Sequence, residues 1–252
     1  MTVQHDRTAL VTGAGGGIGG AIRTALQAQG YRVIGVDVVG PTDDQPAEDW
    51  IVQDLAHRSG CDEVIATTLA RTDGRLDVLV NNAGLQHVSP LRDFPDEQWD
   101  RLLAVMLSAP FRLSRGFWSA LVASETPRIF NVASIHALVG SPGKAAYVAA
   151  KHGLLGLTRV QALEGGPHGL AAVALCPGYV RTPLVEGQIA DQARTLGISA
   201  DDVLDRVMLE PAAIRRLIEP TEIADHVAFL CGPAGRSVSG TALSIDGGWT
   251  AR

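Results

Sequence analysis

Seven short apolar runs, separated by longer segments with the 3.6-residue period of a helix, constrain the fold of this chain most. The runs are TALVTG, RVIGVD, WIVQD, LDVLVNN, RIFNVAS, LAAVALCPG and TALSIDG. They are almost wholly apolar rather than alternating, as strands buried on both faces require. Strands that alternate with helices predict a doubly wound α/β fold, in which helices cover both faces of a seven-stranded parallel sheet.

The rest of the sequence shows no repeat, low-complexity tract or linker, so we interpret residues 1–252 as one domain. Residues 183–219, which follow CPGYVRT, interrupt the alternation with a helical pattern that Gly197 and Pro211 break. Open parallel sheets bind ligands beyond the carboxyl ends of their strands. We therefore expect residues 183–219 to form a small helical lid over a substrate.

Composition excludes several functional classes. The net charge is −6 and no run of Lys or Arg exists, so nucleic-acid binding is not expected. No stretch of about 20 apolar residues predicts a membrane span, and the N-terminus lacks the pattern of a signal peptide, so we expect a cytoplasmic protein. Three scattered cysteines without a CxxC motif predict neither a disulfide framework nor a metal site.

A glycine-rich turn follows the first predicted strand and opens the first predicted helix. In ALVTGAGGGIGGAI, the residues Gly13, Gly17, Ile18 and Gly19 contain the spacing G-x-x-x-G-x-G. Glycines let the backbone turn sharply and approach a diphosphate, and the helix N-terminus offers free N–H groups. A glycine turn that binds nothing is the alternative, and the strand–turn–helix context disfavours it.

Two carboxylates end the next two predicted strands. Asp37 follows Gly17 by 20 residues, where a carboxylate accepts hydrogen bonds from the ribose hydroxyls of NAD and repels the 2′-phosphate of NADP. The neighbouring Ala14 supplies no positive charge to offset that repulsion, so NAD is the predicted cofactor. Asp54 ends the third strand, where an adenine would lie, although it could equally cap a helix.

Ser134, Tyr147 and Lys151 form the candidate catalytic group. Tyr147 and Lys151 are four residues apart, so both project from one face of a helix. A phenol with a pKa near ~10 accepts a proton poorly at neutral pH unless a nearby cation stabilises the phenolate. Lys151 is that cation, and the Ser134 hydroxyl can hold the reacting oxygen. The group predicts acid–base chemistry between a carbinol and a carbonyl.

Over essentially its whole length the sequence resembles the short-chain dehydrogenase/reductase family. TGAGGGIG, NNAG, Ser134 with YVAAK, and the PG pair at 177 and 178 occur in the family order. The resemblance implies a Rossmann-type fold, an NNAG segment that supports the sheet and lines the cofactor site, and assembly into a homotetramer. The implied cofactor contacts include Asn82, Ala83, Gly84, Tyr147, Lys151, Pro177, Gly178 and Val180.

One residue departs from the family pattern. The family usually has an asparagine in the helix after the fourth strand, within a VNL-like triplet, where it helps a water-linked proton relay to reach the lysine. Here the triplet is VML and Met106 holds the position. A thioether cannot donate a hydrogen bond. Other groups rebuild the relay, catalysis is slower, or the fold persists without activity; the otherwise intact site favours the first.

Within the family, the segments NNAGLQHVSPL, AYVAAKHGLLGLT and CPGYVRTPLVEGQIADQA resemble bacterial D-3-hydroxybutyrate dehydrogenases. The resemblance implies a clamp for a substrate carboxylate, composed of Gln86, His136, Lys144 and Gln188. One cation with several directional donors suits a small anionic hydroxy acid whose hydroxyl lies at Tyr147. Each of the four could instead be an ordinary loop or surface residue. Trp249 could close the apolar side of the site or pack in the core.

The predicted activity is therefore reversible, NAD-dependent oxidation of D-3-hydroxybutyrate to acetoacetate. An alternative is a dehydrogenase or reductase of another small hydroxy or oxo compound, such as a 3-oxoacyl reductase. Such a reductase generally prefers NADPH and needs a basic docking patch, and both Asp37 and the acidic net charge argue against it. A protein that binds the dinucleotide without catalysis is the third reading, motivated by Met106.

Overall fold

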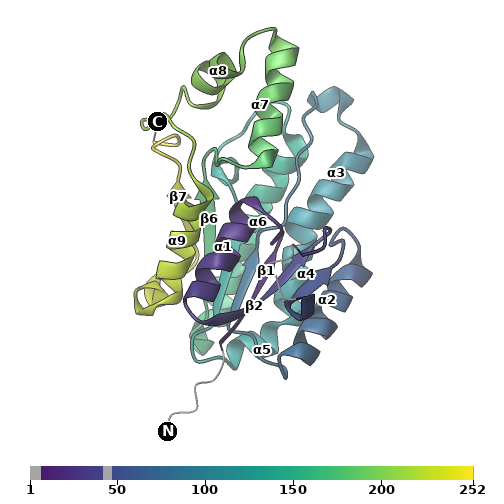
Figure 1. Ribbon diagram of the computed structural model, residues 1–252, viewed down its shortest axis with the longest axis vertical. Helices are drawn as coiled ribbons and strands as arrows, with labels where there is room; N and C mark the ends of the chain where they lie inside the picture. Colours follow the sequence, from purple (N-terminus) through teal and green to yellow (C-terminus); the bar gives the residue numbers. More distant parts are fainter. Residues whose placement is uncertain (1–6, 42–46, 252) are drawn as a thin grey trace.

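The computed structural model describes residues 7–41 and 47–251, and within them seven strands form one sheet (Figure 1). The order is β3-β2-β1-β4-β5-β6-β7, and every pairing is parallel. The seven-stranded parallel sheet predicted from the apolar runs is confirmed. The strands are β1 (Arg7–Thr12), β2 (Tyr31–Asp37), β3 (Trp50–Val52), β4 (Val78–Asn81), β5 (Arg128–Val132), β6 (Ala171–Pro177) and β7 (Thr241–Ile245).

Helices cover both faces of the sheet, as the two-sided burial of the strands requires. On one face, Ile22 of α1 (Gly17–Ala28) and Val227 of α9 (Pro220–Cys231) pack on Val11. On the other face, α2 (Arg58–Arg71), α4 (Ala109–Gly116) and α6 (Ala145–Gly165) cover Leu10 and its neighbours. The described part of the chain also contains α3 (Asp96–Leu103), α5 (Trp118–Val122), α7 (Pro183–Leu196) and α8 (Ala200–Val203).

Single turns of other helix types connect these elements. One π-helical turn, Ala104–Ser108, joins α3 to α4, and a second, Leu204–Met208, continues α8. The 3-10 turns are Ala47–Asp49, Leu91–Asp93, Ile135–Ala137, Gly166–His168 and Pro233–Ser237.

Strand order reverses between β1 and β4, which lie side by side at the centre of the sheet. Chain connections leave this point in opposite directions, so a crevice opens beyond the carboxyl ends of the two strands. The segments that follow β1, β4, β5 and β6 all surround this end of the sheet. Figure 1 shows α7 and α8 projecting beyond the sheet, next to the C-terminus.

The helical expectation for residues 183–219 is correct as far as Met208 and wrong beyond it. Residues 209–219 form an irregular segment. Pro211, near its start, has no backbone N–H to donate to a helix. Its backbone groups bond to other loops instead of to a helix. Ile214 N–H donates to Gly247 O at 2.8 Å, and Ile218 N–H donates to Tyr179 O at 2.9 Å.

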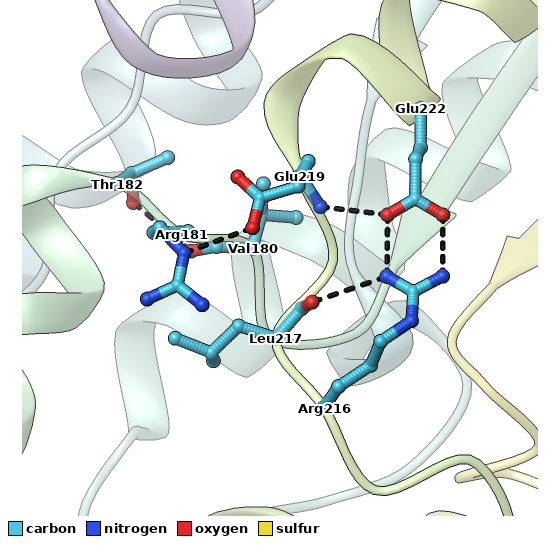
Figure 2. A network of polar contacts seen from close by, with 7 residues as sticks. All are labelled: Val180, Arg181, Thr182, Arg216, Leu217, Glu219 and Glu222. Atoms are coloured by element: carbon cyan, nitrogen blue, oxygen red, sulfur yellow. Dashed lines mark hydrogen bonds and ion pairs between the residues drawn. The ribbon is translucent and has the colours of Figure 1, made fainter.

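A polar network anchors the end of this irregular segment to α9 (Figure 2). Both terminal nitrogens of Arg216 bond to the Glu222 carboxylate, at 2.6 and 2.8 Å. Glu222 also accepts a hydrogen bond from the backbone N–H of Glu219, and Arg181 donates to the Glu219 carboxylate at 2.9 Å. Arg216 lowers the pKa of Glu222 to about 2. The network thus fixes the start of α9 relative to the segment that follows β6.

Replacing Glu222 by Gln should lower the free energy of unfolding by about 1 kcal/mol at pH 7, since it removes a charged helix-capping contact and an exposed ion pair. The folded-state pKa lies below the unfolded one, so the wild-type advantage is complete above about pH 5. It shrinks as pH falls and is gone below about pH 2. Urea unfolding between pH 3 and pH 7 measures it.

The matched control is Glu164→Gln, which removes an exposed carboxylate of α6. This control variant should differ from the wild type by the same small amount at every pH. A Glu222→Gln difference that does not change with pH would contradict the assigned ion pair.

Candidate active site

The glycine-rich turn lies where α1 crosses closely over the end of β1. Gly13 has a φ of +64°, which favours glycine. A Cβ added at Gly19 would lie 2.0 Å from the carbonyl oxygen of Gly13, so only glycine fits there. The N-cap of α1 is Gly16, which makes no side-chain capping bond. The turn therefore presents uncapped backbone donors at the helix N-terminus, as an anion site requires.

The second asparagine of NNAG holds this turn in place. Asn82 Nδ2 donates to the carbonyl oxygens of Thr12 and Gly13, at 2.9 and 3.1 Å. The backbone N–H groups of Asn82 and Ala83 both donate to the Thr12 hydroxyl, at 2.9 and 3.0 Å. Four hydrogen bonds thus connect the end of β4 to the end of β1.

The first asparagine of NNAG has a different role, inside the sheet. Asn81 Nδ2 donates to Asn131 Oδ1 of β5 at 2.8 Å. Asn131 Nδ2 in turn donates to Thr158 Oγ1 and Gln161 Oε1 of α6, both at 2.8 Å. This buried network connects β4, β5 and α6, and α6 is the helix that carries Tyr147 and Lys151. The Asn81 side chain therefore stabilises the sheet, and the Asn82 side chain stabilises the glycine-rich turn.

A cleft of about 410 Å³ opens at this end of the sheet. Ten of the predicted cofactor contacts line it: Gly13, Gly17, Ile18, Asp37, Asp54, Asn82, Ala83, Gly84, Tyr147 and Lys151. The other four lie outside its lining. Gly19 is buried beneath the turn, Pro177 ends β6, Gly178 lines a smaller neighbouring pocket, and Val180 pairs with Ile218.

Sequence reasoning missed several residues of the cleft, among them Gln53, Arg101 and Thr182. Thr182 had a recognisable signal, because Thr before Pro is typical of a helix N-cap. Its hydroxyl accepts a bond from Val185 N–H at the start of α7. Arg101 is an exposed residue of α3 with no distinguishing pattern.

The two carboxylates of the cleft are held by backbone donors. Asp37 Oδ2 accepts a bond from Gly15 N–H at 2.9 Å, which ties the end of β2 to the glycine-rich turn. Asp54 Oδ1 accepts a bond from Ala56 N–H at 2.8 Å. Asp54 caps this local turn and not α2, whose N-cap is His57. The helix-capping alternative for Asp54 is therefore wrong, while its place in the cleft agrees with the prediction.

Ser134, Tyr147 and Lys151 lie together beyond the end of β5. Lys151 is buried, and its Nζ donates to Val132 O at 2.6 Å and lies 5.5 Å from the centre of the Tyr147 ring. Burial lowers the pKa of Lys151 to about 8. Burial raises the pKa of Tyr147, and a hydrogen bond with Ser134 acts in the opposite direction. The three residues are positioned as acid–base chemistry on a carbinol would need.

A pocket of about 60 Å³ adjoins Tyr147 and collects the remaining predicted residues. Gln86 follows β4, His136 follows β5, Lys144 precedes α6, and Gln188 comes from α7. All four line this pocket together with Ser134 and Tyr147. The structure thus brings the whole predicted carboxylate clamp to one place.

Lys144 is the sole cation among the described residues that line this pocket. Its Nζ lies 3.3 Å from His136 Nε2, and both side chains are buried. Burial and the Lys144 charge lower the pKa of His136 to about 4, so the imidazole is neutral near pH 7. Nε2 faces the Lys144 ammonium, so we place the ring proton on Nδ1, which is a buried atom. A hydrogen bond with the Val139 backbone also acts on this ring, so Lys144 is the residue of the pair that can donate to an anion in the pocket.

Three neighbouring residues complete the site. Met106 is buried in the π-helical turn, packed beside Ala150 of α6 and close to Gly84. Trp249 contacts the edge of the His136 ring and donates to Met208 O, so it joins the 204–208 turn to the pocket. The neighbour of Gln86, His87, packs on Phe94 and does not line the pocket.

No cluster of three or more His, Cys, Asp or Glu could hold a metal ion in residues 7–41 and 47–251. Among the helices of that same part of the chain, none is long and apolar enough to cross a membrane.

Known proteins similar to this chain point to one family. The family model for short chain dehydrogenase matches residues 7–193. D-beta-hydroxybutyrate dehydrogenases of Rhizobium meliloti and Cupriavidus necator are 40% and 39% identical, and each alignment covers 98% of this chain and 99% of the relative. An acetoacetyl-CoA reductase of Shinella zoogloeoides is 34% identical over 96% of this chain and 98% of its own.

Solved structures show the same fold. A short chain dehydrogenase family protein from Francisella tularensis superposes with a TM-score of 0.89 at 26% identity, covering 98% of this chain and 100% of the other. An actinorhodin polyketide ketoreductase crystallised with NADPH superposes with a TM-score of 0.88 at 29% identity, covering all of both chains.

Replacing Gly19 by Ala should lower the free energy of unfolding by about 3 kcal/mol or more, because the new Cβ would overlap the Gly13 carbonyl oxygen. The adjacent Gly20→Ala is the matched control. Its Cβ would meet Ala14 O at 3.6 Å, an ordinary contact, and alanine favours a helix by about 0.5–1 kcal/mol. Urea unfolding separates the two. Equal stability of both variants would contradict the close crossing of α1.

Proposed function

The chain belongs to the short-chain dehydrogenase family, and we propose that it reversibly oxidises D-3-hydroxybutyrate to acetoacetate with NAD. The observation that carries this proposal is the 60 Å³ pocket, in which Gln86, His136, Lys144 and Gln188 meet beside Tyr147. Two relatives of about 40% identity bear the name D-beta-hydroxybutyrate dehydrogenase, which supports the substrate.

The 410 Å³ cleft fits the nicotinamide dinucleotide that the family uses. Gly13 and Gly17, both at positive φ, let the backbone turn at the edge of the cleft, and the uncapped start of α1 suits a diphosphate. Asp37 lies where the ribose hydroxyls would bind, and the next residue, Val38, brings no positive charge for a 2′-phosphate. These residues favour NAD. A nicotinamide dinucleotide held by these residues would supply the acceptor for the hydride that leaves the carbinol carbon.

The catalytic residues handle the proton of the same reaction. Ser134 Oγ donates a hydrogen bond to the substrate oxygen, and the Tyr147 phenolate removes the hydroxyl proton. Lys151 has a pKa of about 8 and is therefore mostly charged near pH 7, so it favours the phenolate of Tyr147 over the phenol. In the reverse direction Tyr147 returns the proton to the carbonyl oxygen.

The clamp residues set the substrate class. Lys144 contributes the positive charge, and neutral His136 lies beside it at the same end of the pocket. A small pocket with one buried cation suits a short carboxylate, because charge-assisted bonds are strongest where water is excluded. Gln188 comes from α7, so residues 183–219 act as the lid that closes over the acid.

Reduction of a 3-oxoacyl thioester is the second candidate. The acetoacetyl-CoA reductase relative and the neighbouring ketoreductase crystallised with NADPH favour it. Two features argue against reduction of a thioester. Asp37 disfavours NADPH, and the pocket is small and carries one positive charge. A thioester has no carboxylate at the position that Lys144 would hold.

The direct test is NADH formation by the purified protein with D-3-hydroxybutyrate, run beside the L-isomer and beside NADP. Turnover confined to the D-isomer, with NAD preferred by at least about tenfold, is the expected result. Reduction of acetoacetyl-CoA by NADPH without turnover of the free acid would replace the proposal with the second candidate.

Tyr147→Phe should lower kcat by about a hundredfold or more, because it removes the group that takes the proton. The ring and its packing remain, so NADH binding, followed by fluorescence titration, should not change. Loss of NADH binding in this variant would mean that the hydroxyl shapes the cleft and does not act on the proton. Near-normal turnover would exclude Tyr147 as the base.

Lys144→Ala should raise KM for the acid by about 10- to 100-fold, the usual effect of losing one charge-assisted bond. Affinity for NADH should stay the same, since Lys144 lies outside the dinucleotide cleft. The neutral amide of 3-hydroxybutyrate is the control substrate, and its KM should be insensitive to the variant. An unchanged KM for the acid would remove Lys144 from the carboxylate site.

A further inference from the structure

A second cavity, of about 700 Å³, lies at the opposite end of the sheet from the active site. It surrounds the amino ends of β1, β4 and β5 and the end of α9. Its wall includes apolar surface from Leu76, Ala120 and Ala123. Nothing in the proposed oxidation uses this cavity.

Four arginines from distant parts of the sequence converge on this cavity: Arg7, Arg75, Arg128 and Arg236. Within residues 7–41 and 47–251, none of them forms an ion pair with a carboxylate. The lining has two carboxylates, Asp77 and Glu125. The cavity is thus net positive in a chain whose total charge is −6.

The Asp77 carboxylate accepts hydrogen bonds from groups other than the arginines. Thr8 N–H donates to one of its oxygens at 2.7 Å, and the Ser124 hydroxyl donates to the other at 2.5 Å. Glu125 is exposed at the surface. Within the described residues, neither carboxylate forms an ion pair with the arginines, and the two negative charges offset only half of the four positive ones.

Arg128 is the innermost of the four and is 2% exposed. Its Nε donates to Leu230 O at 3.1 Å and its Nη1 to Pro127 O at 2.8 Å. Its Nη2 is buried and has no hydrogen-bond partner among the described residues. A buried, charged donor without an acceptor is destabilising. Burial lowers the pKa of Arg128, and the positive charge of Arg236 acts in the same direction.

We propose that this cavity binds a phosphate-bearing small molecule, with the phosphate group between Arg128 and the exposed rim residues Arg75 and Arg236. Guanidinium groups bind phosphate oxygens through paired N–H donors, and a phosphate here would offset the mutual repulsion of the arginines. The volume exceeds that of a phosphate ion and is typical of metabolite pockets. The apolar wall formed by Leu76 and Ala120 would contact the part of the ligand that carries no phosphate.

The test is isothermal titration calorimetry with inorganic phosphate and with glycerol 3-phosphate, against sodium chloride at matched ionic strength. We expect one saturable site. Glycerol 3-phosphate should bind more tightly than inorganic phosphate, because the apolar wall contacts its carbon chain. Equal affinity for the two would assign the site to inorganic phosphate. The double variant Arg75→Gln, Arg236→Gln should weaken binding by at least about tenfold, the effect of losing charge-assisted bonds. Arg128→Lys keeps the positive charge but loses the paired N–H donors of the guanidinium group, so it should also weaken phosphate binding.

Two controls locate the site. Arg92→Gln removes an equally exposed arginine away from the cavity and should bind phosphate as the wild type does. Saturating NADH covers the uncapped start of α1, which could also attract phosphate, and should leave the binding intact. Competition by NADH, or equal binding by the double variant, would overturn the proposal. Turnover of the hydroxy acid is independent of this result, because the rim arginines lie outside the active site.

Discussion

The close crossing of α1 over the end of β1 is the constraint on which the site depends. It requires glycine at position 19, because the Gly13 carbonyl occupies the space of a side chain. Asn82 then bonds to the carbonyls of Thr12 and Gly13 and keeps the end of β4 in register with the turn. The carbonyl groups of Thr12 and Gly13 therefore determine the position of two features at once. One is the proposed cofactor cleft, and the other is the end of β4, which leads toward the proposed substrate pocket.

The sequence alone predicted the sheet well because each strand is buried on both faces, which produces continuous apolar runs such as AAVALC. Periodicity was less informative beyond Met208. The residues there keep a helical spacing, yet Pro211 lacks a donor and Ile214 and Ile218 bond to neighbouring loops. Long-range hydrogen bonds of this kind leave no mark in a local pattern. The proposed carboxylate clamp came from a family resemblance, and spacing alone could not have assembled its four segments.

Charged surface residues were the least predictable from sequence. Arg101 in the cleft and the four arginines of the distal cavity follow no motif, and each looks like an ordinary solvated residue where it stands. Their significance depends on convergence in space and on burial, as for Arg128. The same is true of the neutral state of His136, which follows from its burial and its closeness to Lys144 and not from its position in the chain.

The two lysines of the active site are also the only lysines in the sequence, among 21 basic residues. The other basic side chains are arginines, whose guanidinium groups do not react with ordinary amine reagents near neutral pH. Both lysines are buried, and burial lowers the pKa of each. Chemical acylation of lysine side chains is thereby confined to this one site. Protection from such a reagent would report directly on ligand occupancy, without any engineered label.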